Sequence, residues 1–215
     1  ALCAQQCPEP IKAQLYKILF KPDKNAPEYK AVVAASKQTQ MGALNLLAAA
    51  GAISSPFEFH WQRFLFDQFP KGIAFPALNA PAIDATKLPL AGVKAFSIDD
   101  SSTTEIDDAL SVQGLGTPVI TLGIHIAAPG LAIQPDDPTD QLARARMSTV
   151  YMPGYKITML PDSVVNQYTL AAGQDCPALS LYVEFDANDL SILNTVTKLE
   201  RVTIAENLRH DQLGD

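Results

Sequence analysis

The chain has 215 residues, of which 47% are hydrophobic and 18% are charged, a composition typical of a folded globular protein. It excludes intrinsic disorder and collagen-like repeats. The longest stretches of low polarity, residues 41–53 and 118–133, are shorter than the roughly 20 apolar residues that a transmembrane helix needs, so we expect no membrane span. We expect a cytoplasmic protein, because no basic segment precedes an apolar run as it would in a secretory signal.

The net charge of −7 is divided unevenly along the chain. Residues 1–80 carry eight Lys and Arg against five Asp and Glu, a charge of +3, whereas residues 81–215 carry eight against eighteen, a charge of −10. The charge of −10 over residues 81–215 is unusual for a nucleic-acid-binding protein, since phosphate binding normally requires surplus positive charge. It is understandable if the acids hold divalent metal ions.

The first seventy residues predict four helices. Apolar residues recur at helical spacing over residues 8–20, a second helix begins at Pro27 and ends near Lys37, and a third runs from about Thr39 until Gly51 stops it. The fourth begins at a capping box with proline at the first helical position, Ser55-Pro56-Phe57-Glu58. Its apolar stripe is expected to lie in the core and consists of Phe57, Trp61, Phe64 and Leu65.

The short connection between the second and third helices resembles a helix-turn-helix. The third predicted helix would then offer polar side chains to a nucleic-acid groove or strand, namely Gln38, Thr39, Gln40 and Asn45. Lysines on these helices could contact phosphate, or they could equally keep a small helical module soluble. We therefore predict a helical, helix-turn-helix-like nucleic-acid-binding module over residues 1–75, followed by a proline-rich linker over residues 76–94.

From residue 95 the apolar residues recur with a period close to two, which indicates strands. Strands are predicted at residues 95–98, 109–112, 119–127, 179–185 and 192–204, with Asn188-Asp189 as a hairpin turn between the last two. Helices are expected from Asp137-Pro138 to about Ser148 and from Pro161-Asp162 onward. Residues 95–215 therefore predict an α+β domain with a mixed or antiparallel sheet.

The most informative segment is residues 99–108, which carries five carboxylates and no Lys or Arg. Two carboxylates about 4 Å apart repel each other by about 4 kcal/mol at an effective dielectric constant of about 20, so their convergence requires protons or a cation. Mg²⁺ or Mn²⁺ would suit such oxygen ligands. A solvated acidic turn is the alternative. An EF-hand fits poorly, because Thr104 and Leu110 stand where its glycine and glutamate would be.

The order of these acids, Asp99 followed after five residues by Glu105-Ile106-Asp107-Asp108, resembles the aspartate signature of the ribonuclease II (RNB) family of exoribonucleases. The resemblance runs from about residue 95 to 186 and includes residues 123–129, 144–153 and 159–161. It implies that the chain holds the first part of an RNB-type catalytic domain, with a mixed sheet, and that the remainder of the domain is expected beyond Asp215.

The resemblance implies catalytic, metal-holding roles for Asp99, Glu105, Asp107 and Asp108. In a two-metal scheme one Mg²⁺ or Mn²⁺ ion would activate the attacking water and the other would stabilise the leaving 3′ oxygen. Glu105 stands where the family pattern has Asp. Its extra methylene would move the carboxylate by about 1.5 Å or make the metal contact indirect.

Tyr151 matches an aromatic side chain with which the family stacks the terminal nucleotide, and the alternative is an ordinary core tyrosine. Arg144 and Arg146 lie on the helix before it and could bind RNA phosphates, although solvent-facing or salt-bridged arginines are equally compatible with their position. His125 lies inside a predicted strand, where a histidine is more often a core residue than a catalytic base.

The function implied by the resemblance is a 3′→5′ exoribonuclease that hydrolyses single-stranded RNA to nucleoside 5′-monophosphates. Two alternatives stay open. A catalytically inactive RNA-binding or regulatory homologue is suggested by Glu105 and by the family's scissile-phosphate arginine and second stacking aromatic, which cannot be located in this sequence. A DNA-binding regulator is suggested by the helix-turn-helix resemblance alone.

Overall fold

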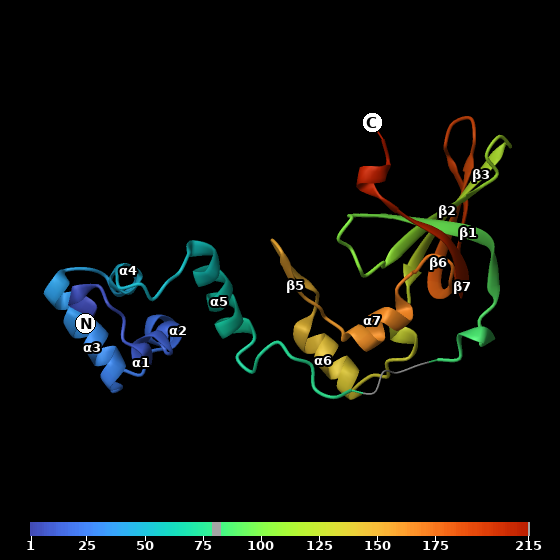
Figure 1. Cartoon of the computed structure of the whole chain (residues 1–215). Helices are drawn as coiled ribbons and strands as arrows, with labels where there is room; N and C mark the ends of the chain where they lie inside the picture. Colours follow the sequence, from blue (N-terminus) through green and yellow to red (C-terminus); the bar gives the residue numbers. More distant parts are fainter. Residues whose placement is uncertain (79–82, 215) are drawn as a thin grey trace. The chain divides into compact units, whose positions relative to one another are not determined.

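The computed structural model describes residues 1–78 and 83–214, and the chain forms two compact units, Ala1–Ala74 and Phe75–Asp215 (Figure 1). Part of the predicted linker, residues 79–82, lies outside the described residues. The linker prediction is wrong at its far end, because the first strand of the second unit already begins at Leu90. Within the described ranges no helix combines the length and apolar character needed to cross a bilayer.

The first unit is helical and has its own apolar core. Its helices are α1 Glu9–Lys12, α2 Leu15–Phe20, α3 Pro27–Thr39, α4 Ala43–Ala49 and α5 Pro56–Gln68, preceded by a 3-10 turn at Leu2–Ala4. The single helix predicted over residues 8–20 is wrong, because Gln14 leaves helical geometry at φ −111° and ψ 16°. The core is formed by residues that include Leu2, Ile11, Leu15, Ile18, Val32, Leu46 and Leu47.

The connection between α3 and α4 consists of residues 40–42, so α4 begins later than the predicted start near Thr39. Gln40 adopts the left-handed conformation, with φ 56°, which turns the chain sharply after α3. The two helices therefore follow each other closely, and the helix-turn-helix stays a prediction.

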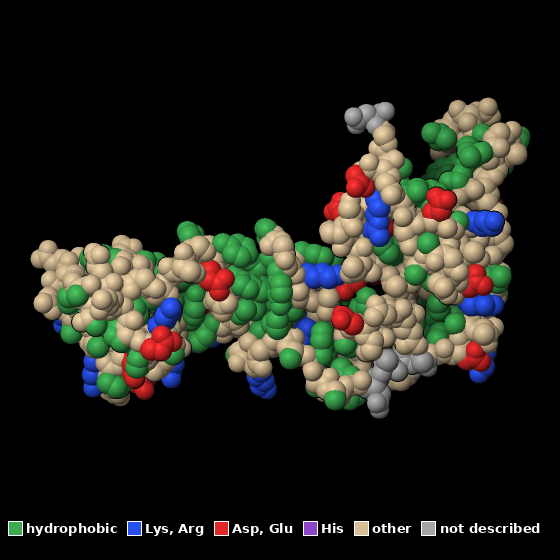
Figure 2. All heavy atoms as spheres, viewed as in Figure 1, with side chains coloured by type: hydrophobic (Ala, Val, Ile, Leu, Met, Phe, Trp, Pro, Cys, Tyr) green, Lys and Arg blue, Asp and Glu red, His purple; other side chains and the backbone are tan. Residues whose placement is uncertain are grey.

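The start of α5 is as predicted, because Ser55 caps the helix by accepting a hydrogen bond from the Glu58 amide at 3.1 Å. The prediction for its buried face is wrong at Phe57, whereas Trp61, Phe64 and Leu65 are partly buried. Phe57 is 49% exposed, and the buried aromatic is instead Phe59, which stacks on Tyr16 with ring centroids 5.7 Å apart. Figure 2 shows hydrophobic side chains gathered over α5 on the face in view.

The second unit is built around a closed barrel with strand order β1-β2-β3-β6-β7, which confirms the α+β class (Figure 1). These strands are β1 Leu90–Asp99, β2 Asp108–Gln113, β3 Val119–Ala127, β6 Asp175–Asp186 and β7 Ile192–Arg209. Neighbouring strands are antiparallel except β1 and β7, which pair in parallel and close the barrel. The sheet is therefore mixed.

A polar layer fills part of the barrel interior. His125 is fully buried, as expected of a core residue, and its ring nitrogens bond to Ser111 Oγ at 2.9 Å and Ser180 Oγ at 2.8 Å. Gly123 leaves room for this layer, since a Cβ there would lie 2.3 Å from Ser111 Oγ and 2.7 Å from His125 Nε2. Around it the apolar core contains Ala95, Ala109, Ala178, Val202 and Ile204.

The segment between β3 and β6 carries the remaining elements. It begins with a 3-10 turn at Pro129–Leu131, and the predicted helices are present as α6 Pro138–Arg146 and α7 Asp162–Tyr168. Between α6 and α7 lies a hairpin of β4 Val150–Met152 and β5 Tyr155–Ile157. Two further 3-10 turns, Ala85–Lys87 and His210–Gln212, lie outside this segment. This hairpin was not predicted, because strands of three residues are too short to show an alternating pattern.

Candidate active site on the acidic loop

The four predicted catalytic acids, together with Asp100, lie on residues 99–108, here called the acidic loop, which joins β1 to β2. The second half of the loop is anchored by Ile106, whose side chain is only 4% exposed. The Ile106 amide donates to Thr169 Oγ1 at 2.8 Å, and the Leu170 amide donates to the Ile106 carbonyl at 2.9 Å. These contacts fix the backbone immediately before the acidic pair Asp107 and Asp108.

The first half of the loop is held by the end of β7. Arg209 Nη1 donates to the carbonyl oxygens of Asp100 at 2.9 Å and Thr103 at 3.3 Å. Because β7 runs parallel to β1, Asp99 lies opposite Arg209 in the register. The sequence contains no local signal for this bracing role, since Arg209 is more than 100 positions away from the residues that it holds.

Asp99, Asp107 and Asp108 interact electrostatically. Partial burial is the main cause that raises the pKa of Asp107, and the negative charges of Asp108 and Asp99 raise it further. Asp99 Oδ2 accepts a hydrogen bond from Ser97 Oγ at 2.6 Å, and the backbone of Asp107 is held by the Ala127 amide at 2.8 Å. Asp107 thus lies within electrostatic reach of both Asp99 and Asp108.

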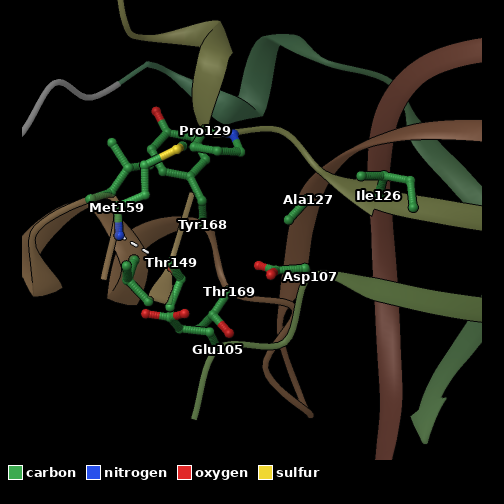
Figure 3. A pocket seen from close by; sticks show the side chains of 11 residues that line it. Glu105, Asp107, Ile126, Ala127, Pro129, Thr149, Met159, Tyr168 and Thr169 are labelled. Atoms are coloured by element: carbon green, nitrogen blue, oxygen red, sulfur yellow. Dashed lines mark hydrogen bonds between the residues drawn. The ribbon is translucent and has the colours of Figure 1, made fainter. Parts of the chain in front are cut away.

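Two of the predicted acids line a cavity of about 260 Å³. Figure 3 shows the carboxylates of Glu105 and Asp107 facing this cavity. Its other walls are largely apolar and come from β3, α7 and the connecting segments, with Ala127, Pro129, Met159, Leu160, Tyr168 and Thr169 among the lining residues. The cavity therefore combines an acidic rim with largely apolar walls.

The chemistry of the donor set fits Mg²⁺ or Mn²⁺, because carboxylate oxygens are the ligands that hard divalent cations prefer. The negative charges of Asp108 and Asp99 add to the effect of burial in raising the pKa of Asp107, and a cation would compensate these charges. Across residues 1–78 and 83–214, no three Asp, Glu, His or Cys side chains are spaced to share one ion.

Glu105 forms a salt bridge with a lysine of the neighbouring hairpin. The Glu105 side chain is 9% exposed, and its Oε1 lies 3.6 Å from Lys156 Nζ on β5. The same ammonium group donates to Thr104 Oγ1 at 2.9 Å. Sequence reasoning missed Lys156, since nothing in the local pattern indicates that this residue faces the acidic loop.

Tyr151 lies on β4 and is 69% exposed, which excludes the alternative of a core tyrosine. Partial burial raises the pKa of its hydroxyl, and the charges of Glu105 and Asp107 raise it further, so the ring lies within electrostatic reach of these acids. Tyr151 and Glu105 both line a second cavity, of about 400 Å³. The structure therefore brings the predicted stacking residue beside the acidic loop.

The two predicted phosphate-binding arginines have structural partners. Arg144 forms salt bridges with Asp136 and Asp140 on the surface of the same unit. The Arg146 guanidinium stacks over the Phe75 ring, 3.8 Å from its centroid, and donates to the Thr158 carbonyl at 2.8 Å. Phosphate binding by either arginine thus stays a prediction.

Comparison with known proteins relates the second unit to ribonucleases. The sequence model of the RNB domain matches residues 88–212. An uncharacterised ribonuclease of Synechocystis is 36% identical over 126 residues, which cover 56% of this chain and 19% of that protein. Exoribonuclease 2 of Serratia proteamaculans is 35% identical over 113 residues, which cover 52% of this chain and 18% of that protein. The chain therefore spans about a fifth of the length of these relatives.

Solved structures at 19–21% identity share the fold. RNase R of Mycoplasma genitalium, in complex with ribose-methylated single-stranded RNA, aligns with 72% of this chain and 26% of its own at a TM-score of 0.61. An active-site mutant of the Dss1 exoribonuclease from Candida glabrata aligns with 94% of this chain and 29% of its own at a TM-score of 0.72. Yeast Ssd1, described as a pseudonuclease, aligns with 74% of this chain and 22% of its own at a TM-score of 0.63.

Proposed function

The chain belongs to the RNB domain family, and from this membership we propose that it forms part of a 3′→5′ exoribonuclease that hydrolyses single-stranded RNA to nucleoside 5′-monophosphates. One observation carries the proposal. The acids of the family signature lie on a loop whose backbone is anchored at Ile106 and braced by Arg209, beside the exposed ring of Tyr151. Such preorganisation is what a catalytic group requires.

In this proposal Asp99, Asp107 and Asp108 would hold Mg²⁺ or Mn²⁺. Because no three acids of residues 1–78 and 83–214 are spaced to share one ion, each ion would be held by one or two of these carboxylates together with water and substrate phosphate. When bound, these ions supply an activated water and compensate the charge that develops on the phosphate and the leaving oxygen. Anchoring of the loop keeps the carboxylates at a fixed distance from the RNA end.

Tyr151 is proposed to stack on the terminal base. Its exposed ring can accept any base, because every base offers a π-face, and this suits hydrolysis without sequence preference. RNA is supported as the substrate by the RNase R relative, whose structure contains single-stranded RNA. Arg144 and Arg146 would contact RNA phosphates only after exchanging their present partners.

The test uses the natural polypeptide that contains residues 1–215 and a 5′-labelled single-stranded RNA with Mg²⁺. We expect stepwise shortening from the 3′ end, and its loss in Asp108→Asn. Asp100→Asn is the matched control, because it makes the same charge change on the same loop at a position outside the family signature. Unchanged turnover in Asp108→Asn would refute the proposed role of the acids.

A second candidate is a catalytically inactive RNA-binding homologue. It is favoured by the ion pair that occupies Glu105 and by the fold shared with a pseudonuclease. This candidate predicts that RNA binds in the same assay without shortening, with or without Mn²⁺.

The helical unit Ala1–Ala74 is proposed to bind nucleic acid through its helix-turn-helix-like pair, α3 and α4. Support comes from the charge of +3 over residues 1–80 and from the short connection between these helices. A competition assay distinguishes the possible ligands. Preference for single-stranded RNA supports the exoribonuclease proposal, whereas preference for duplex DNA would favour the DNA-binding regulator.

A further inference from the structure

We propose that Lys156 is a positioning residue that ties the hairpin carrying Tyr151 to the acidic loop, and that Glu105 serves as the partner of Lys156 rather than as a direct metal ligand. The inference rests on the proposed function, since it assigns Tyr151 to the terminal nucleotide. It gives this chain a way to hold the stacking ring in place that does not use the metal ions.

The hairpin register puts Lys156 and Tyr151 side by side. Tyr151 on β4 is the direct partner of Lys156 on β5, and directly opposed residues of an antiparallel pair project from the same face of the sheet. A contact that fixes the Lys156 side chain therefore also constrains the face from which Tyr151 projects. A two-stranded hairpin is only marginally stable alone, so such a contact matters for its orientation.

The ammonium group of Lys156 has two partners on the acidic loop. Its Nζ lies 3.6 Å from Glu105 Oε1 and donates to Thr104 Oγ1 at 2.9 Å. Because the Glu105 side chain is only 9% exposed, its carboxylate needs a partner for its charge, and Lys156 supplies one. The loop residues that receive this contact are adjacent to the Ile106 anchor, so the hairpin is connected to the best-fixed part of the loop.

The length of Glu105 matters for this pairing. Replacing it with Asp, the residue of the family pattern, would shorten the side chain by one carbon–carbon bond of about 1.5 Å. The distance to Lys156 Nζ would then rise from 3.6 Å to about 5 Å, beyond the range of an ion pair. The departure from the family pattern at Glu105 is thus accounted for by the lysine on the facing hairpin.

The pair also borders the place where the nucleotide is expected. Glu105, Tyr151 and Lys156 all line the cavity of about 400 Å³ between the acidic loop and the hairpin. A cavity of this size is typical of small-ligand sites. Glu105 lines the neighbouring cavity with Asp107 as well, so its position connects the stacking site with the acids.

The first experiment measures RNA binding without metal, by fluorescence anisotropy of a labelled single-stranded oligoribonucleotide in EDTA. Lys156→Met is expected to weaken binding by about fivefold or more, the lower end of the effect of losing one stacked base. Lys156→Arg should restore most of the affinity. Lys87→Met, which removes an exposed lysine in the same unit, is the matched control, and melting curves verify that each variant is folded.

A double-mutant cycle separates positioning from direct phosphate binding. In a Tyr151→Ala background, Lys156→Met should cause less than a twofold further loss, because the ring that it positions is absent. An equal loss of affinity in both backgrounds would overturn the inference, since Lys156 would then act on RNA independently of Tyr151. This result would not affect the proposed hydrolytic function.

The second experiment tests Glu105 by calorimetric titration with Mn²⁺. If Glu105 serves Lys156, Glu105→Gln changes the Mn²⁺ affinity by less than about twofold and weakens metal-free RNA binding as Lys156→Met does. A tenfold or greater loss of Mn²⁺ affinity would show that Glu105 is a ligand and overturn its assigned role. Conversely, wild-type protein that binds RNA without shortening it would refute the hydrolytic function while the Lys156 effect on binding remained measurable.

Discussion

Replacing Thr169 with valine tests whether the acidic loop is anchored as described. Valine has nearly the shape of threonine but lacks the hydroxyl that accepts the hydrogen bond from the Ile106 amide at 2.8 Å. Because Ile106 is 4% exposed, water does not readily replace this acceptor. An unpaired buried donor costs about 1–3 kcal/mol, so we expect the free energy of unfolding to fall by that amount.

Urea unfolding followed by circular dichroism measures the loss, and amide exchange locates it. The Ile106 amide should exchange faster in Thr169→Val, whereas the Leu170 amide, which donates to the Ile106 carbonyl, should stay protected. Thr169→Ser keeps the hydroxyl and serves as the control. Wild-type stability together with wild-type protection of the Ile106 amide in Thr169→Val would refute the anchoring role.

Three further outcomes are expected. Gly123→Ala should lower the melting temperature, at a cost of about 1–3 kcal/mol, because its Cβ would lie 2.3 Å from a buried hydroxyl; Gly92→Ala, which meets nothing within 4 Å, should change it little. Burial lowers the pKa of His125, so the unfolded state binds the proton more tightly and stability should fall as pH drops below about 6.5. The urea midpoint of the wild type should therefore decrease over this pH range, and that of His125→Gln should lack this pH dependence. Burial and like charges raise the pKa of Asp107, so the ionised carboxylate destabilises the fold at neutral pH. In metal-free buffer Asp107→Asn should therefore have a higher melting temperature than the wild type at pH 7, and the difference should shrink as pH falls through the pKa of Asp107. Equal melting temperatures at pH 7 would contradict this.

The sequence predicted the elements whose signal is local. The alternation of apolar residues located β3 at its observed bounds, Val119–Ala127, and proline with a capping residue located the starts of α5 and α6. The spacing of the acids identified the loop and three carboxylates that interact in the structure. Each of these signals lies within about ten neighbouring residues.

Features that depend on distant partners were not predictable in this way. Closure of the barrel requires parallel pairing of β1 with β7, and Arg209 and Lys156 reach the acidic loop from strands that follow it by many residues. Phe57 was wrongly placed on the buried face of α5. This helix carries aromatic side chains at many positions, so the periodicity of its apolar residues does not distinguish Phe59 from Phe57. Tertiary packing decides these cases.

Binding of Mn²⁺ to the acidic loop tests the central claim most directly. Calorimetric titration of the metal-free protein should show Mn²⁺ binding that is at least tenfold weaker in Asp107→Asn and in Asp108→Asn but unchanged in Asp100→Asn. Equal Mn²⁺ affinity in all four proteins, or no binding to the wild type, would contradict a metal-holding role for these carboxylates.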